Sequence, residues 1–454
     1  MFDSLILRRI SAVMTSQGTQ LQVDFESQPE YWKLATRVAF RFSFVYFGLY
    51  CVLTQISVSL VPLPNVGIPD PATLWPLRLI VSWTAARVFR VTKPLIYSDS
   101  GSGDKTFDWV LLFCIFVIAV AATALWSILD RKRSNYIALY KWFRLAIRFC
   151  LAGQMFVYGW AKAIPLQMPY PYLARLLEPF GNFSPMGVLW ASIGASPAYE
   201  VFAGCAEMLG GILLILPHTT MLGALVCLAD MTQVFMLNMT YDVPVKLLSF
   251  HLILLSLFLL APDLKRLLAF FFLNQSAGPS TQPPLFATAR RNRIALVVQV
   301  FVGLMLISMN AWGSWKGWHL YGGGSPRSPL YGIWNVDDFK VDGQVRSPVL
   351  TDQERWRRVL LEIPTRMAYQ RMDDSMVRYG ASIDADHQTL KLTKDDDKNW
   401  TAIFSFQRPS PDRLLLDGEM DHHKIQMQLQ LFDRNKLLLI SRGFHWIQEY
   451  PFNR

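Results

Sequence analysis

Long apolar runs alternate with short polar connections over the first two-thirds of the chain, a pattern typical of a protein that crosses a membrane several times. Five runs of about 17–25 residues predict membrane-spanning helices, and two further apolar runs carry charges near their ends. The seven predicted spans cover residues 38–62, 109–129, 142–163, 197–216, 219–239, 244–262 and 293–313. We therefore expect a polytopic all-α membrane bundle.

The segment 73–91 is apolar but contains Arg78, Arg87 and Arg90. An arginine-bearing amphipathic stretch of this kind is typical of a helix that lies in the membrane interface or enters the membrane partway. We expect one interfacial helix here. The alternative is a further span, which would move only the N-terminus to the other side of the membrane.

From about residue 330 the periodicity changes from helical to alternating. In "HKIQMQLQL" (423–431) apolar residues alternate with glutamines, and in "WTAIFSF" the residues Trp400, Ala402, Phe404 and Phe406 share one face. Further strands are expected in "LYGIWNVDDF" (330–339), "MVRYGASI" (376–383), "QTLKLTK" (388–394), "RLLLDG" (413–418) and "NKLLLISRGFHWI" (435–447). The pattern predicts a small antiparallel sandwich or barrel of about eight to ten strands.

The tripeptide "GIW" (332–334) resembles the G-x-W signature of lipocalin-type barrels, with Arg442 near the last expected strand as the matching basic residue. This resemblance implies a barrel that binds a ligand in its interior. The alternative, which we favour, is a closed domain with a filled core that docks to another surface.

Basic residues are concentrated in three segments, 1–41, 130–148 and 263–293, which hold 16 of the 24 Lys and Arg residues up to position 313. Because basic loops tend to remain in the cytoplasm, an odd number of spans places the N-terminus there and the chain after about residue 314 outside. We expect a cell-membrane protein whose C-terminal domain is periplasmic if the source is a Gram-negative bacterium. The net charge of +10 then faces anionic lipid and cytoplasm. Membrane lipid is the expected partner, and nucleic acid is not.

Two Pro/Gly/Ser-rich linkers, "SAGPSTQPP" (276–284) and "YGGGSPRSP" (321–329), flank the last predicted span. The chain accordingly divides into a cytoplasmic segment (1–37), a transmembrane domain (38–313) and an extracytoplasmic β-rich domain (314–454). All five cysteines fall in predicted spans, so the β-rich domain is expected to fold without disulfides. No spacing of His, Cys, Asp or Glu predicts a metal site.

Polar residues inside the predicted spans are informative. A charge at mid-bilayer costs about 2.5–3.5 kcal/mol on insertion scales and persists only where it finds a partner away from lipid. Gln154, Tyr158 and Lys162 repeat every four residues, which places them on one helix face. Gly204 and Glu207 share a face of the following span, where small residues allow a neighbouring helix to approach closely. Glu207 is therefore expected in a tight helix contact.

Glu207 and Asp230 lie about ten and nine residues from the outer ends of their predicted spans, roughly 14–15 Å deep at ~1.5 Å per residue. Two carboxyl groups in one layer near the middle of the membrane are suited to holding and passing protons. We interpret them as the floor of an outward-facing polar cleft, with Lys162 and Lys246 at its mouth and Gln154, Tyr158 and Gln233 on its walls. Glu207, Asp230 and Lys162 are the candidate catalytic residues, and Gln154, Tyr158, Gln233 and Lys246 the candidate cofactor-binding residues. The alternative for Lys162 is a side chain that reaches the interface beside Trp160, and His251 is expected to be a satisfied core histidine.

Gly159 and Lys162 in "RFCLAGQMFVYGWAKAIP" form a G-x-x-K motif, which Arg148 precedes. Glu207, Gly210 and Gly211 in "AEMLGGILLILP" form an E-x-x-G-G motif, and Gly223 follows in the next predicted helix. With these residues the block from about 142 to 262 resembles the DoxX family of four-helix membrane proteins. That family includes a thiosulfate:quinone oxidoreductase subunit, so the resemblance implies that Lys162 and Glu207 are functional and that a quinone is the cofactor. A weaker similarity, to the membrane domain of vitamin K-dependent carboxylases, rests on a helical body followed by an exported β-rich part.

Three functions follow as alternatives. The first is a quinone- or thiol/sulfur-linked redox component, in which Glu207 and Asp230 handle protons and electrons come through a diffusible quinone or a partner membrane or redox subunit. The second is a non-enzymatic membrane assembly or lipid-handling module that docks through its β domain. The third, a small-molecule transporter, is disfavoured because no inverted repeat is visible. The sequence leaves open whether the protein is an enzyme.

Overall fold

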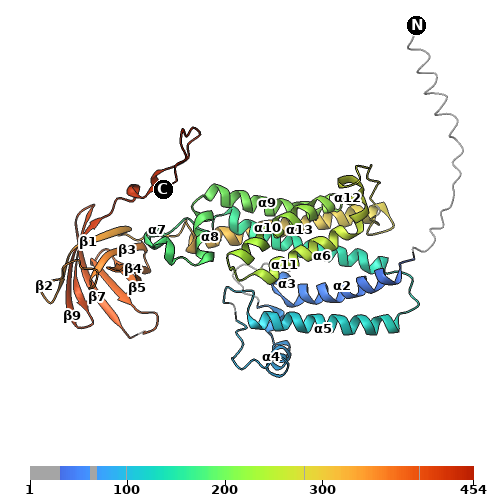
Figure 1. The fold of residues 1–454 in the computed structure, drawn as a ribbon, viewed down its shortest axis with the longest axis horizontal. Coiled ribbons are helices and arrows are strands. Elements are labelled where there is room, and N and C mark those ends of the chain that lie inside the picture. Colours follow the sequence, from blue (N-terminus) through green and yellow to red (C-terminus); the bar gives the residue numbers. More distant parts are fainter. Residues whose placement is uncertain (1–30, 62–68, 99, 281, 398, 454) are drawn as a thin grey trace, which may run out of the picture.

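The computed structural model describes residues 31–61, 69–98, 100–280, 282–397 and 399–453, which form a bundle of long helices with a β-barrel at one end (Figure 1). The expected cytoplasmic segment 1–37 lies outside the described residues as far as residue 30. The change from helix to barrel falls between Tyr321, where the last long helix ends, and Gly332, where the first strand begins.

The long helices run side by side along the long axis of the molecule (Figure 1). They are α2 (Leu34–Leu53), α5 (Thr106–Leu129), α6 (Ile137–Ala163), α9 (Pro197–Ile215), α10 (Thr220–Thr240), α11 (Lys246–Leu260) and α13 (Ala289–Tyr321). The shorter helices are α3 (Gln55–Ser59), α4 (Leu77–Arg87), α7 (Leu173–Leu177), α8 (Pro185–Gly194), α12 (Leu264–Phe271) and α14 (Leu438–Ser441).

Six helical segments of the described chain are long and apolar enough to cross a membrane, which indicates an integral, multi-pass membrane protein. They are Leu34–Leu53, Thr106–Leu129, Pro197–Ile215, Pro217–Thr240, Lys246–Phe271 and Ala289–Tyr321. The helix α6 is also long, at 27 residues, but carries Lys141, Arg144, Arg148 and Lys162.

Four helices form the core of the bundle. The helix α6 packs against α9, α9 against α10, α10 against α11, and α11 against α6, which closes the ring. The pair α2 and α5 packs together beside this ring, and α13 contacts both α6 and α9. Because α6 meets four other long helices, α2, α9, α11 and α13, its charged residues face protein on most sides.

The first predicted span, 38–62, is not one continuous helix. The helix α2 ends at Leu53, Thr54 is extended (φ −108°, ψ 178°), and α3 begins at Gln55. The Thr54 hydroxyl donates to the carbonyl oxygen of Tyr50 at 2.7 Å, a local bond of the kind that competes with helix continuation. The hydropathy of residues 38–62 gives no sign of this break in the helix.

The segment 73–91 contains a helix, α4, of 11 residues. At ~1.5 Å per residue this helix is about 16 Å long, roughly half the thickness of a bilayer core. It packs against α5, and Figure 1 shows it nearly end-on where α5 runs across the view. The structure therefore agrees with a short helix that lies across the bundle.

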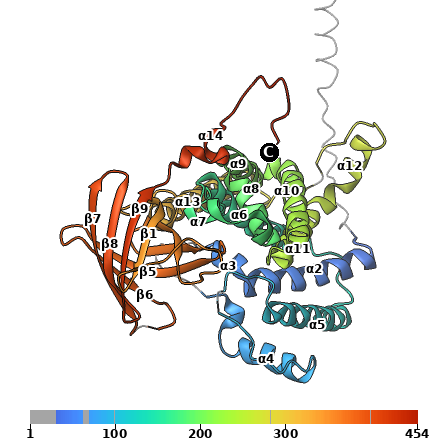
Figure 2. The ribbon, with the colours of Figure 1, turned by 60° about the vertical axis from the view of Figure 1, so that its left-hand side comes forward.

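The C-terminal domain is a closed antiparallel barrel of eight strands, which confirms the predicted β domain and selects the barrel over the sandwich. Its strands are β1 (Gly332–Val341), β3 (Trp356–Ile363), β4 (Arg366–Arg371), β5 (Met376–Asp384), β6 (Thr389–Thr393), β7 (Thr401–Ser410), β8 (Arg413–Met420) and β9 (His423–Leu431). They pair in that order, β9 pairs back with β1, and the two-residue β2 (Gln344–Val345) adds a hairpin to the end of β1. Figure 2 turns this curved wall of strands toward the viewer.

Apolar side chains fill the barrel interior. Trp334, Phe339, Trp356 and Phe404 are each at most 1% exposed, and Trp356 stacks on Tyr369 with ring centroids 4.1 Å apart. A filled interior agrees with a closed domain rather than with a barrel that binds a ligand in its interior.

The strand predicted over 435–447 is wrong. This stretch forms a short 3-10 turn and α14, because β9 already pairs with β1 and leaves the closed barrel without an edge for another strand. Arg442 consequently lies over the ring of Phe452, 4.7 Å from its centroid, and not against Trp334. The cation over Trp334 is Arg408 of β7, at 5.7 Å.

A small apolar contact joins the membrane body to the barrel. Leu173 and Ala174 of α7 are buried together with Ile333 and Leu360 of the barrel, and the backbone N–H of Leu173 donates to the carboxylate of Glu362 at 3.2–3.3 Å. Burial raises the pKa of Glu362, and this N–H opposes the shift. The joint is compact, and α7 reaches across it to β3.

Candidate functional site

The backbones of α6 and α9 touch at two glycines. A Cβ atom on Gly204 would lie 2.4 Å from the backbone nitrogen of Ala163 and 2.5 Å from the carbonyl oxygen of Gly159. A Cβ atom on Gly159 would lie 2.6 Å from Cγ of Met208. The expected tight helix contact beside Glu207 is therefore confirmed, and glycine is required on both sides of it.

One turn from this contact, Lys162 and Glu207 form a buried ion pair. The Lys162 ammonium lies 2.9 Å from both carboxylate oxygens of Glu207, and the two side chains are 9% and 4% exposed. The ammonium also lies 5.6 Å from the centre of the Tyr158 ring. The side chain of Lys162 thus turns into the protein toward Glu207 and does not extend to the interface beside Trp160.

A cavity of about 180 Å³ adjoins this ion pair, enclosed by α6, α8, α9, α10 and α11. Five of the seven residues proposed for the polar cleft line it: Tyr158, Lys162, Glu207, Asp230 and Gln233. The two carboxyl groups expected in one layer therefore face one cavity. Three aromatic residues, Trp190 of α8 and Tyr199 and Phe202 of α9, add to the wall.

Two buried oxygen atoms of the cavity wall have no hydrogen-bond partner within the part of the chain that the structure describes. They are Oδ2 of Asp230 and Oε1 of Gln167. A buried polar atom without a partner costs about 1–3 kcal/mol, so such atoms in a cavity indicate a place where a ligand or water donates a hydrogen bond. Gln167 lies in the α6–α7 connection, where no periodicity pointed to it.

Gln154 does not line this cavity. Its amide donates to the hydroxyl of Ser59 at 2.7 Å, and its oxygen accepts from Nε2 of Gln55 at 3.3 Å. The same Gln55 nitrogen donates to the Tyr158 hydroxyl at 3.0 Å. Gln55 and Ser59 were missed in the sequence, because the break after α2 that turns them toward α6 is not visible in the hydropathy of 38–62.

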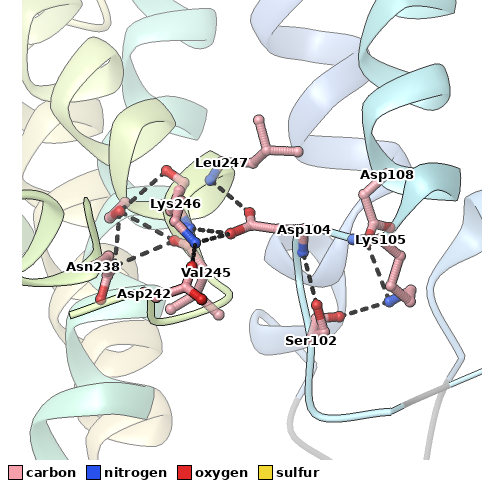
Figure 3. A network of polar contacts seen from close by, with 10 residues as sticks. Ser102, Asp104, Lys105, Asp108, Asn238, Asp242, Val245, Lys246 and Leu247 are labelled. Carbon is pink, nitrogen blue, oxygen red and sulfur yellow. Dashed lines mark hydrogen bonds and ion pairs between the residues drawn. The ribbon is translucent and has the colours of Figure 1, made fainter. Parts of the chain in front are cut away.

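Lys246, the other residue proposed for the cleft mouth, lies in a different network (Figure 3). Its ammonium is 3.0 Å from Oδ1 of Asp242 and 3.8 Å from Oδ2 of Asp104. The Asp104 carboxylate also accepts from the backbone N–H groups of Lys246 and Leu247 at 2.8 and 2.9 Å. A carboxylate that accepts the free N–H groups at a helix start stabilises that helix. This network therefore fastens the connection before α5 to the start of α11.

Two further polar residues of the core are satisfied mainly within the protein. Glu200 is fully buried, and its Oε1 accepts from the backbone N–H of Met168 at 2.8 Å, whereas its Oε2 has no partner among the described residues. His251 bonds to the carbonyl oxygen of Leu247 at 2.6 Å and to the Tyr46 hydroxyl at 2.9 Å. The expectation of a satisfied core histidine is confirmed.

These features define a helical membrane protein with a polar, ion-paired cavity in a four-helix core and an appended closed β-barrel. The chain is similar to the uncharacterized protein YwoB of Bacillus subtilis (strain 168), with 29% identity over 133 residues that cover 27% of this chain and 79% of that protein. No protein-family model matches the chain, and no solved structure matches it significantly.

Proposed function

We propose that α6 is a seventh membrane span and that the N-terminus faces the cytoplasm, with the barrel on the other side. The three basic segments meet at one end of the bundle, because Arg37 donates to the carbonyl oxygen of Arg133 at 2.6 Å and Tyr140 to Gln282 at 3.3 Å. The helix α13 begins at the third basic segment and ends just before the barrel, so the basic segments and the barrel lie at opposite ends of this helix. Reporter fusions after residues 135 and 330 should show cytoplasmic and extracytoplasmic activity respectively, and the same side for both would contradict this orientation.

We infer that the cavity beside the Lys162–Glu207 pair binds the head group of a lipid-soluble quinone. The observation that carries this proposal is the pair of unpartnered oxygens, on Asp230 and Gln167, in a cavity that is otherwise mostly apolar and aromatic. They would accept hydrogen bonds from the hydroxyl groups of a quinol, and the Tyr158 hydroxyl and the Gln233 amide would donate to the carbonyl groups of a quinone. A volume of about 180 Å³ suits a single ring, with the isoprenoid tail left in lipid.

In this role the protein binds the quinone and passes protons to it, while the electrons come from another molecule. Reduction of a quinone to a quinol takes two electrons and two protons. Asp230 and Glu207 are placed to pass the protons, and a partner redox subunit or a thiol or sulfur compound would supply the electrons. The resemblance to DoxX proteins points to the same chemistry.

Mass spectrometry of the protein purified in mild detergent tests the quinone proposal. Wild type should carry a quinone, and Lys162→Met should lose most of it, because the substitution removes the charge that holds Glu207 in the cavity wall. Lys246→Met is the matched control, since it removes the same charge outside the cavity, and it should retain the quinone. A quinone that is absent from wild type, or equally retained by both variants, would refute the proposal.

The second candidate function is membrane assembly or lipid handling through the β domain. It is favoured by the segment after β9, where Phe444, Trp446, Ile447 and Tyr450 are each at least 77% exposed. Aromatic residues in such number on an exposed segment are typical of a docking surface. This function predicts that removal of 322–454 abolishes activity in cells. The variant Lys162→Met with Glu207→Leu, which removes both charges of the buried pair together, should leave activity intact, the opposite of what the quinone role requires of Glu207.

A further inference from the structure

A second cavity, of about 590 Å³, lies at the end of the bundle away from the barrel. It is formed where the basic connections 130–148 and 263–293 meet, between the first turns of α6, the loop before α10, the start of α12 and the start of α13. The hydrogen bond from Tyr140 to Gln282 ties the two connections together at this point. Its size falls within the range of roughly 300–1,000 Å³ that is usual for small-molecule sites.

Five cationic side chains line this cavity. Lys141, Arg144 and Arg148 follow one another at spacings of three and four residues on a single face of α6, and Arg266 and Arg293 come from the opposite wall. Among the described lining residues the one carboxylate is Asp263. A concentration of like charge inside a cavity is unfavourable unless something negative offsets it.

Two of these arginines are satisfied within the protein. Arg148 donates to the carbonyl oxygens of Leu214 and Ile215 at 2.7–2.9 Å, which satisfies the end of α9. Arg266 pairs with Asp263 at 2.6 Å. Arg148 and Arg266 therefore stabilise the walls of the cavity, and the positive charge that a ligand could neutralise comes from the other three residues.

The remaining three are less fully satisfied, and of these Arg144 donates a hydrogen bond to the Tyr140 hydroxyl. Within the part of the chain that the structure describes, Lys141, Arg144 and Arg293 form no ion pair with a carboxylate. The Nε atom of Arg144 is buried and has no hydrogen-bond partner. A buried guanidinium nitrogen without an acceptor, in a cavity with two more unpaired cations, indicates a missing anion.

We propose that this cavity binds the phosphate group of an anionic phospholipid. Guanidinium and ammonium groups are the usual partners of phosphate oxygens, and basic cavities between helices at the cytoplasmic side are typical sites for acidic head groups. The cavity also has apolar walls, from Leu145, Leu285 and Leu296, which suit the first carbons of a lipid. The site is separate from the quinone cavity and does not depend on it.

Native mass spectrometry of the full chain from mixed phosphatidylglycerol and phosphatidylcholine tests this site. Wild type should retain phosphatidylglycerol preferentially, and Lys141→Gln with Arg144→Gln should weaken that retention roughly 30-fold, since each basic residue near acidic lipid contributes about fivefold. The control variant, Arg290→Gln with Arg291→Gln, removes the same charge from exposed positions at the same end of the bundle. It should change retention less than about fivefold.

The outcomes separate the lipid from free phosphate. Equal losses in the two double variants, or no preference for phosphatidylglycerol in wild type, would overturn a lipid site. Thermal unfolding with inorganic phosphate would then show whether the cavity binds a soluble phosphate. Stabilisation of wild type that is lost in Lys141→Gln with Arg144→Gln would support a soluble phosphate ligand, and no stabilisation of wild type would overturn the anion site altogether. If that double variant does not fold, Lys141→Gln alone should weaken retention about fivefold.

Discussion

Glu207→Gln is expected to lower the free energy of unfolding by about 3–5 kcal/mol, because it leaves the Lys162 ammonium buried without a counter-charge. Both carboxylate oxygens of Glu207 bond to that ammonium at 2.9 Å, and neither side chain is more than 9% exposed. The glutamine would offer the ammonium one oxygen acceptor in place of two, and its N–H donors cannot neutralise the charge. Thermal or denaturant unfolding in detergent, followed by intrinsic fluorescence, measures the change.

The double variant Lys162→Met with Glu207→Leu separates loss of the pair from loss of packing. It removes both charges together, so we expect most of the lost stability to return, as it does when buried ion pairs are replaced by apolar residues of similar size. Lys246→Met is the control for a partly exposed pair, since the side chains of Lys246 and Asp242 are 25% and 86% exposed, and it should cost less than about 1 kcal/mol. A cost for Glu207→Gln no larger than that of Lys246→Met would show that Lys162 finds another partner.

The stability experiment also bears on function. If the double variant folds well but carries no quinone, the ion pair is needed for quinone binding and not for folding. If it folds well and still carries quinone, the cavity recognises its ligand through Tyr158, Gln233 and Asp230. Either result separates the two roles that the geometry gives to Lys162 and Glu207.

The barrel was the part of the fold that the sequence determined best. Several of its strands, such as β7 and β9, alternate clearly, so residues such as Ile425, Met427 and Leu429 are all buried as expected. The strands β3 and β4 were not among the expected segments, and the last expected strand does not form, because the apolar run 437–440 has no alternation. A closed barrel has no edge to receive it, and closure depends on pairing between β1 and β9, which are about 90 residues apart in the chain and share no local signal.

The candidate site could be predicted in part, because periodicity fixes which residues share a helix face. That reasoning brought Tyr158, Lys162, Glu207, Asp230 and Gln233 to one cavity. Periodicity does not say which neighbour a face meets at each depth. Gln154 lies two turns from Lys162 on the same face, and there the neighbour is α3 and not α9.

Lys246 illustrates a second limit. It was expected near one end of its span and is the first residue of α11. The direction of its side chain depends on Asp104 and Asp242, which come from a loop and from the α10–α11 connection (Figure 3). Loop conformation has no periodic signal in the sequence. Residues at helix ends are therefore the hardest to assign to a cavity from sequence alone.

Gly204→Ala is expected to cost about 3 kcal/mol or more, because the new methyl group would overlap atoms that cannot move aside. The nearest atoms are the Ala163 nitrogen at 2.4 Å and the Gly159 carbonyl oxygen at 2.5 Å, and both belong to the backbone of α6. Relief requires α6 and α9 to separate, which also withdraws Lys162 from Glu207 one turn further along. We therefore expect loss of thermal stability together with loss of any ligand that depends on the ion pair.

Gly313→Ala is the matched control, since Gly313 also lies within a helix, α13, but nothing is within 4 Å of its Cβ position. Alanine is the better helix former by about 0.8–1.0 kcal/mol, so this variant should be neutral or slightly stabilised. Comparison of the two variants by thermal unfolding in the same detergent removes the general effect of a glycine replacement. If Gly204→Ala unfolds at the temperature of Gly313→Ala, then the two helices do not meet at these glycines, and the placement of Glu207 against Lys162 fails with them.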